Sequence, residues 1–123
     1  MSLLESGENY LETILVLSKE NKELHAIAIV NHLGYSKPSV SIMLKRLKEE
    51  NYITIDNNSH IFLTEKGYEI AQKIYERHEI IANALIALGV NKETALIDAC
   101  KIEHDLSEES FNAIKNHLEK YYK

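Results

Sequence analysis

The sequence predicts a mainly α-helical chain with one small β-hairpin near its middle. Apolar residues recur at helical spacing along most of the 123 residues, and only one proline and four glycines interrupt them. The helical period gives way to short β-type runs only at residues 52–63. No internal repeat or low-complexity tract is visible. These observations favour a small globular chain of one or two domains.

The first half of the chain is predicted to form three helices followed by the hairpin. The helices are placed at residues 7–20, 24–33 and about 36–50, and the strands at 52–55 and 60–63. Gly34 is placed to end the second helix, Ser36 to cap the third, and Pro38 to fit its first turn. The expected buried residues of helices two and three are Ile27, Val30, Leu33, Val40, Met43, Leu44 and Leu47. This order of elements is that of a winged helix-turn-helix.

The second half of the chain is predicted to be helical. Thr64 caps a long helix over about 65–88 that ends at Gly89. Asn91 caps a helix over about 92–105, and Ser107 caps the last, over about 108–121. We therefore divide the chain into a winged helix-turn-helix domain at 1–71 and a helical domain at 72–123.

Charge and composition limit the classes of function that the chain can have. The net charge of −5 argues against a nonspecific nucleic-acid coat, but residues 36–48 hold four cations and no acid. That basic window coincides with the predicted third helix. No run is long enough to span a membrane, and residues 1–5 do not resemble a signal peptide. The single cysteine cannot form an internal disulfide, so we expect a cytoplasmic protein without membrane contact.

The third helix predicts double-stranded DNA binding. The second helix of a helix-turn-helix enters the major groove and presents its N-terminal residues to the base edges. Here Ile42 is suited to a thymine methyl group, and Lys45, Arg46 and Lys48 are suited to phosphates. The candidate DNA-binding residues are Ser36, Lys37, Pro38, Ser39, Ser41, Ile42, Lys45 and Arg46. The candidate contacts of the wing with the DNA backbone are Asn57, Asn58 and His60.

A second motif, near the C-terminal end, predicts a metal site. Cys100, Glu103 and His104 are spaced so that one face of a helix carries all three. A thiolate, a carboxylate and an imidazole suit iron(II), cobalt, nickel or zinc, and the carboxylate extends the range to manganese. Further donors are His78 on the long helix and Glu12, with Asn9 one turn earlier, on the first helix. Each residue alone also fits a solvated or packing role, so the compact spacing carries the prediction.

These features together resemble the DtxR/MntR family of metal-dependent transcriptional repressors. The resemblance spans nearly the whole chain. It rests on segments 8–12, 36–41, 63–67 and 77–78, and above all on Cys100-Lys101-Ile102-Glu103-His104-Asp105-Leu106-Ser107. It implies that the helical domain is a dimerisation domain, and that metal bound between it and the first helix activates DNA binding.

Carried over position by position, the resemblance implies Glu12, His78, Cys100, Glu103 and His104 as metal ligands. Asn9 stands where manganese-type members carry Asp and iron-type members carry Met, and its amide oxygen is a possible neutral ligand. Cys100 matches the iron-type members, whereas manganese-type members have Glu at this position. The resemblance therefore implies Fe(II) first and Mn(II) second.

The expected function is that of a homodimeric repressor in metal homeostasis. Its two recognition helices would lie about 34 Å apart on a palindromic operator, in an arrangement selected by metal. The expected dimer surface draws on a stripe of apolar residues in the helical domain. This stripe comprises Ile80, Ile81, Ala84, Leu85, Leu88, Leu96 and Ile97, some of which must instead form the core.

Three other functions stay open at this point. The first is a metal-independent winged-helix regulator that responds to another ligand or to a protein partner. The second is a metalloenzyme, although the chain has no H-E-x-x-H motif, nucleophile elbow or glycine-rich phosphate loop, so we expect no enzyme. The third is a module that binds only protein.

Overall fold

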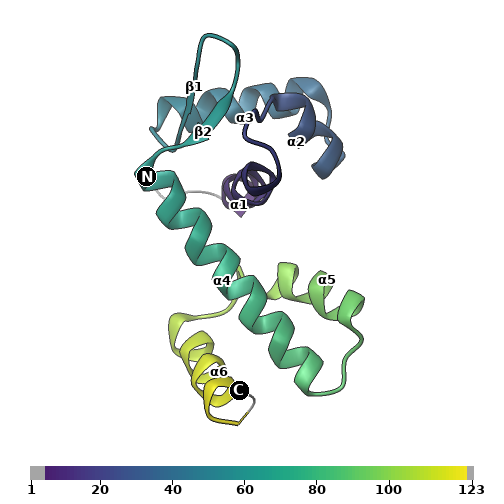
Figure 1. Ribbon diagram of the computed structural model, residues 1–123. Coiled ribbons are helices and arrows are strands. Elements are labelled where there is room, and N and C mark those ends of the chain that lie inside the picture. The colour runs from purple at the N-terminus through teal and green to yellow at the C-terminus, as the bar shows by residue number, and fades with distance from the viewer. Residues whose placement is uncertain (1–4, 122–123) are drawn as a thin grey trace. The chain divides into compact units, whose positions relative to one another are not determined.

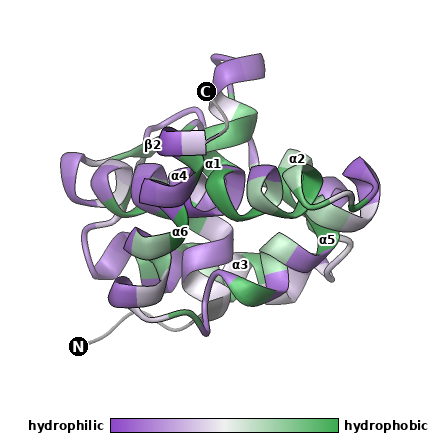
Figure 2. Cartoon of the chain, turned by 90° about the horizontal axis from the view of Figure 1, so that it is seen from below, coloured by the Kyte–Doolittle hydropathy of each residue, from purple (hydrophilic) through white to green (hydrophobic). Residues whose placement is uncertain are grey.

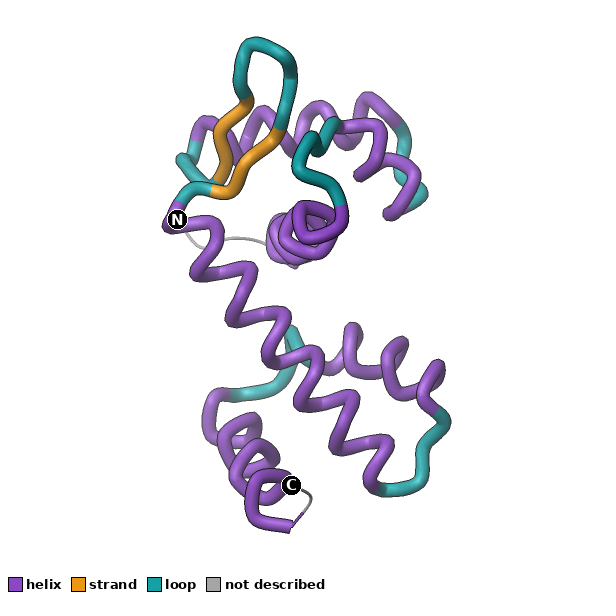
Figure 3. Tube along the Cα trace, viewed as in Figure 1, coloured by secondary structure: helices purple, strands orange, loops and turns teal. Residues whose placement is uncertain are grey.

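The computed structural model describes residues 5–121, so the ends of the two predicted domains at 1–4 and 122–123 lie outside the described residues. Helices dominate this part of the chain, with one two-stranded antiparallel hairpin (Figures 1 and 3). The elements are α1 (Glu5–Glu20), α2 (Ala26–Leu33), α3 (Lys37–Glu49), β1 (Ile53–Ile55), β2 (Ile61–Leu63), α4 (Glu65–Ala87), α5 (Lys92–Ile102) and α6 (Glu108–Tyr121). The predicted fold class, mainly α with a single hairpin after three helices, is confirmed.

The chain divides into two compact units, Met1–Gln72 and Lys73–Lys123. Hydrophobic and hydrophilic residues are interleaved along the helices of both units, as amphipathic helices require (Figure 2). Within residues 5–121, no helix combines the length and the apolar character needed to cross a bilayer.

In the first unit, α1 packs against α2 and β2, while α3 packs against α2 and β1. The largest fully buried side chains are Leu11, Ile14, Leu24, Ile29, Val40, Leu47 and Ile53. The predicted buried stripe of α2 was wrong, because Ile29 fills the core and Ile27 is 49% exposed. The helix begins at Ala26 rather than at residue 24, and Leu24 enters the core from an extended segment. The Leu24 carbonyl accepts a hydrogen bond from the Ile61 N–H at 2.8 Å, which fixes that segment beside β2.

The exit from the hairpin is fixed by Thr64 and Gly67. The Thr64 hydroxyl donates to the Asn51 carbonyl at 2.7 Å and accepts the Gly67 N–H at 3.1 Å, so it caps α4 as predicted. A Cβ on Gly67 would lie 2.0 Å from the Tyr52 carbonyl oxygen. Glycine is therefore required where α4 passes the start of the hairpin.

In the second unit, the rest of α4 packs with α5 and α6 around a small core of Ile81, Ala82, Ala99 and Phe111. Asn91 and Ser107 cap α5 and α6 as predicted, each accepting a backbone N–H of its own first turn. The predicted dimer stripe is divided between core and surface. Ile81 is 3% exposed, whereas Leu88 and Ile97 are 78% and 59% exposed.

Candidate metal centre and nucleic-acid interface

Three potential ligands meet at the C-terminal end of α5. Cys100 and Glu103 come from one face of this end, and His78 comes from α4. One ligand atom from each side chain lies within 4.8 Å of the other two. His78 is half-buried, Glu103 is buried, and Cys100 is exposed. A single ion can therefore reach an imidazole, a carboxylate and a thiolate from the second unit alone.

Glu103 is the centre of this cluster. Its side chain is 1% exposed, Oε2 lies 3.3 Å from His78 Nδ1, and Oε1 lies 3.4 Å from His104 Nε2. Among the described residues, neither carboxylate oxygen accepts a hydrogen bond. A buried carboxylate is costly unless cations or hydrogen bonds compensate it, so this arrangement favours a bound cation.

His104 does not share the helical face predicted for it. Helix α5 ends at Ile102, not at residue 105, and Glu103 keeps helical dihedrals as the C-cap. His104 lies in the following turn, which the Asp105 N–H closes onto the Ile102 carbonyl at 2.9 Å. The group of three converging donors does not include His104, which instead faces the second oxygen of Glu103.

The donor set fits a first-row transition metal. Thiolate and imidazole are borderline-soft ligands, and a carboxylate adds charge and hardness, a mixture that suits Fe(II), Mn(II), Co(II) or Zn(II). The buried, hydrogen-bond-poor carboxylate of Glu103 is consistent with such a group. Asn9 and Glu12 lie on α1 in the first unit, half-buried and one turn apart on the same face.

The candidate DNA-binding residues line the exposed side of α3. Gly34 ends α2 with a φ of 74°, and the Ser36 hydroxyl accepts the Ser39 N–H at 3.2 Å, which starts α3 as predicted. Ile42 is 70% exposed. At helical spacing it lies opposite the buried face and is flanked on the next turn by Lys45 and Arg46. The eight predicted residues are all exposed.

A groove of about 760 Å³ runs between α3, the start of α2 and the hairpin. Its floor is aliphatic, with Val30, Leu44 and Ile61 among its residues, and no acidic side chain is among the described residues that line it. The cations on its α3 side are Lys37, Lys45 and Lys48. These three lysines, which include the predicted phosphate contacts Lys45 and Lys48, make the groove positive, and a positive surface attracts anions such as DNA phosphates.

The turn of the wing is held by Asp56. Oδ1 accepts the backbone N–H groups of Asn58 at 2.8 Å and His60 at 2.9 Å, and Oδ2 lies 3.2 Å from His60 Nδ1. The backbone hydrogen bond from His60 is the main cause that lowers the pKa of the Asp56 carboxyl below its usual value. Asn57 and Asn58, which were predicted to contact the DNA backbone, are exposed at the tip of the wing.

Sequence reasoning gave no role to Arg77, which directly precedes His78. Its side chain is only 14% exposed and reaches the connection between α5 and α6. A signal was present in the sequence, because Arg77 falls on the helical stripe defined by the buried Ile74 and Ile81. An arginine within an apolar stripe indicates a cation with a specific partner.

Two family descriptions together match almost the whole chain. Residues 2–61 match "Iron dependent repressor, N-terminal DNA binding domain", and residues 64–122 match "Iron dependent repressor, metal binding and dimerisation domain". The second description covers the segment that contains His78, Cys100 and Glu103.

Individual relatives agree with these descriptions. The transcriptional regulator MntR of Escherichia coli O157:H7 is 38% identical over 114 residues, which are 93% of this chain and 74% of the relative. An uncharacterized HTH-type transcriptional regulator of Methanocaldococcus jannaschii is 36% identical over 119 residues, 95% of each chain. The solved structure of the manganese regulator SloR superposes with a TM-score of 0.81 at 27% identity. That match covers 97% of this chain and 55% of SloR, so the chain spans about half the length of that structure.

Proposed function

The chain belongs to the iron-dependent repressor family, and from this premise we propose that Fe(II), with Mn(II) as the second candidate, activates it to bind operator DNA. It is a metal-dependent transcriptional repressor, as the descriptions of its family state, and it is similar to transcriptional regulators named MntR. No finding supports a metal-independent regulator. The observation that carries the proposal is the convergence of His78, Cys100 and Glu103 within 4.8 Å.

We propose that these three residues and His104 hold the ion, together with Glu12 and Asn9 of α1. The first three are supported by their convergence, and His104 by its contact with Glu103. Glu12 and Asn9 are included on the family resemblance alone. When bound, the ion supplies positive charge that compensates the buried Glu103 carboxylate and the Cys100 thiolate.

We infer Fe(II) ahead of Mn(II) because of Cys100. A thiolate is a soft ligand that Mn(II), a harder ion, prefers less than Fe(II) does. SloR is a manganese regulator by its title, which keeps Mn(II) as the alternative. The variant Cys100→Glu should shift the preference toward Mn(II), because a carboxylate is the harder donor.

The DNA-binding part of the proposal assigns the exposed residues of α3 to a palindromic operator bound by a homodimer. The acid-free window 36–48 and the lysine-lined groove support phosphate contacts, and the exposed Ile42 supports contact with bases. The exposed Leu88, Leu96 and Ile97 of the second unit are the side chains we assign to the dimer surface. We infer a regulator that acts in the cytoplasm, on DNA, and that is not an enzyme.

Anaerobic fluorescence anisotropy on the chain's own promoter DNA tests the proposal. The protein is titrated with Fe(II), with Mn(II) and with a chelator. Tight binding that requires metal supports the switch, and the ion that acts at lower concentration decides between iron and manganese. Tight DNA binding that a chelator leaves unchanged would contradict the metal mechanism. No DNA binding under any condition would contradict the proposed binding of operator DNA.

A further inference from the structure

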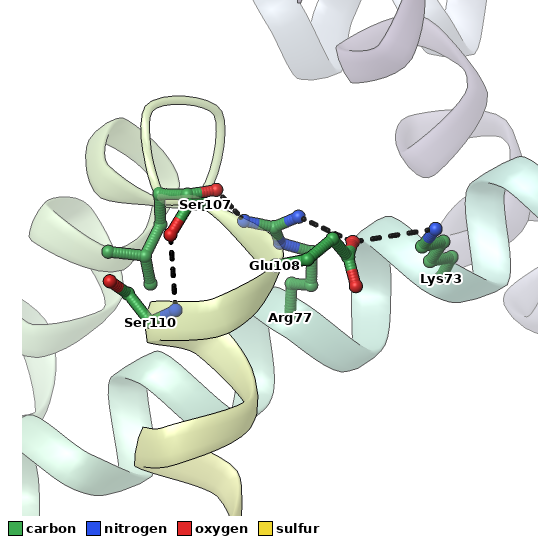
Figure 4. Close-up of polar contacts among 6 residues, drawn as sticks. Lys73, Arg77, Ser107, Glu108 and Ser110 are labelled. Atoms are coloured by element: carbon green, nitrogen blue, oxygen red, sulfur yellow. Dashed lines mark hydrogen bonds and ion pairs between the residues drawn. The ribbon is translucent and has the colours of Figure 1, made fainter.

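Arg77 connects α4 to the turn that carries two of the proposed ligands. Figure 4 shows the Glu108 carboxylate between the Arg77 guanidinium and Lys73 of α4. Nη2 donates to the Leu106 carbonyl at 2.5 Å, and Nη1 lies 3.4 Å from Glu108 Oε1. The guanidinium carbon also stands 5.0 Å from the centre of the Phe111 ring. One side chain therefore contacts the connection between α5 and α6 at Leu106 and the first turn of α6 at Glu108 and Phe111.

The contact with the Leu106 carbonyl is the strongest of these. The Arg77 side chain is 14% exposed, so this short, charge-assisted hydrogen bond is largely screened from water. Glu108 is 60% exposed and is shared with Lys73, which is itself 68% exposed. Exposed ion pairs of that kind contribute little, so the carbonyl determines where Arg77 holds the turn.

Leu106 lies in the same turn as the proposed ligands. It follows Glu103 by three residues and His104 by two, and its side chain packs against the core of the second unit. The Asp105 N–H closes the turn onto the Ile102 carbonyl, which leaves the segment little freedom between Glu103 and Leu106. Fixing the Leu106 carbonyl therefore limits where the Glu103 carboxylate can lie relative to His78, the residue next to Arg77.

We propose that Arg77 is the positioning residue of the metal centre. It holds the turn at 103–107 against α4 through the Leu106 carbonyl, so that Glu103 faces His78. This inference rests on the proposed metal site but assigns Arg77 no direct contact with the ion. Groups that orient metal ligands typically change metal affinity by about 10- to 100-fold when they are removed.

The chain offers a matched control for this role. Lys115 of α6 pairs with Glu76 of α4 at 2.7 Å, so it also ties α6 to α4. Its contact with Glu76 lies outside the turn at 103–107. Lys115→Met therefore controls for the loss of one cation between α4 and α6 whose partner is Glu76 rather than the turn. The variants Arg77→Met and Lys115→Met each replace a long cation with an unbranched apolar side chain and differ in which contact they remove.

Anaerobic Co(II) titration, followed by the visible absorption of the bound ion, tests the proposal. We expect Arg77→Met to weaken Co(II) binding by about 10- to 100-fold and Lys115→Met to change it less than about twofold. The absorption of the thiolate–cobalt pair should persist in Arg77→Met, because Cys100 stays on α5. Equal Co(II) affinity in Arg77→Met and the wild type, or equal losses in both variants, would overturn the proposal.

A double-mutant cycle with Glu103→Gln identifies the ligand through which Arg77 acts. If Arg77 positions Glu103, the double variant binds Co(II) no more weakly than Glu103→Gln alone. Additive losses would overturn this role. If Arg77→Met does not fold, as judged by circular dichroism, Arg77→Lys replaces it, because an ammonium cannot match the fork geometry of the guanidinium. A wild-type affinity in Arg77→Lys would then count against the proposal.

Hydrogen exchange in the metal-free protein gives an independent readout. The N–H groups of Glu103 and Asp105 donate to the carbonyls of Ala99 and Ile102, and these hydrogen bonds join the turn that Arg77 holds to the end of α5. Both N–H groups should exchange faster in Arg77→Met than in the wild type. In Lys115→Met they should exchange at the wild-type rate. Unchanged exchange in Arg77→Met would contradict the proposal. If the wild-type protein binds no metal, the proposed function is overturned as well. If the wild type and Arg77→Met both bind Co(II) tightly, only the role of Arg77 is overturned.

Discussion

The two units present their functional side chains in opposite ways. In the second unit, the carboxylate at the centre of the candidate metal site is 1% exposed and lies between two imidazoles at 3.3 and 3.4 Å. In the first unit, the residues assigned to DNA lie on the open side of α3, where Ile42 is 70% exposed. The Glu103 carboxylate is enclosed by its neighbours, whereas the side chains on the open side of α3 are positioned mainly by the helix that carries them.

This difference predicts two kinds of mutational response. Ligands that share one ion act together, so removal of any of them should affect the whole switch. Surface cations act through a screened, long-range field, so their effects should be small, roughly additive and salt-dependent. The unit with the buried site should therefore show large, nonadditive losses, and the exposed surface should show graded ones.

The largest expected effect is that of Glu103→Gln. The amide keeps the size of the side chain but removes the charge that pairs with a cation, so the increase of operator affinity on adding metal should disappear. Coupling of this kind is typically about 5- to 150-fold. Anisotropy with and without Mn(II) or Fe(II) measures it. The control is Glu109→Gln, an exposed glutamate in the first turn of α6. A Glu103→Gln protein that keeps the full metal response would remove Glu103 from the ligand set.

Lys45→Ala should give a smaller and graded loss. If Lys45 contacts one phosphate, its removal lowers the slope of log affinity against log salt by about one and weakens binding about fivefold near 0.15 M salt. The loss should be the same for operator and unrelated DNA, because phosphates carry no sequence. Lys22→Ala, in the exposed connection between α1 and α2, controls for net charge. An unchanged salt slope in Lys45→Ala would exclude the phosphate contact.

The elements that sequence alone predicted well are those fixed by local chemistry. Ser36, Thr64, Asn91 and Ser107 each accept an N–H in the first turn of the helix they begin, as their side chains dictate. The convergence of Cys100 and Glu103 also follows from local spacing on one helix. Such features need no knowledge of the rest of the fold.

The features that escaped prediction depend on contacts between distant residues. The phase of α2 was misjudged because Leu24 is fixed by Ile61, far along the chain. Arg77 finds its carbonyl partner 29 residues away, so its place in an apolar stripe could indicate a partner but could not identify it. The apolar stripe of the second unit could not be divided either, since only packing shows that Ile81 is buried and Leu88 exposed.

A smaller effect is expected at the bases. If Ile42 contacts a thymine methyl group, replacing that thymine with deoxyuridine removes one buried methyl. The loss is about 0.8 kcal/mol, or roughly fourfold in affinity, for each contacted methyl. Ile42→Ala should bind more weakly than the wild type and should no longer distinguish thymine from deoxyuridine. Anisotropy on the matched pair of operators measures both. Equal sensitivity of wild type and Ile42→Ala to the substitution would show that another residue reads the methyl.

The smallest expected effect is in the turn of the wing and concerns stability. Because the folded protein lowers the pKa of Asp56, its carboxylate stabilises the fold above the ordinary carboxyl pKa of about 3.9, and this contribution is lost as the pH falls through the lower folded value. Asp56→Asn keeps an oxygen that can accept the N–H groups of Asn58 and His60 but no longer titrates. The difference in unfolding free energy between wild type and Asp56→Asn should therefore be greatest near neutral pH and shrink below about pH 4. Carboxylates common to both proteins cancel in that difference, which chemical denaturation at several pH values measures. Since Asp56 is exposed to solvent, a large difference would mean that this surface turn is as tightly coupled as the buried centre, and the contrast between the two units would fail.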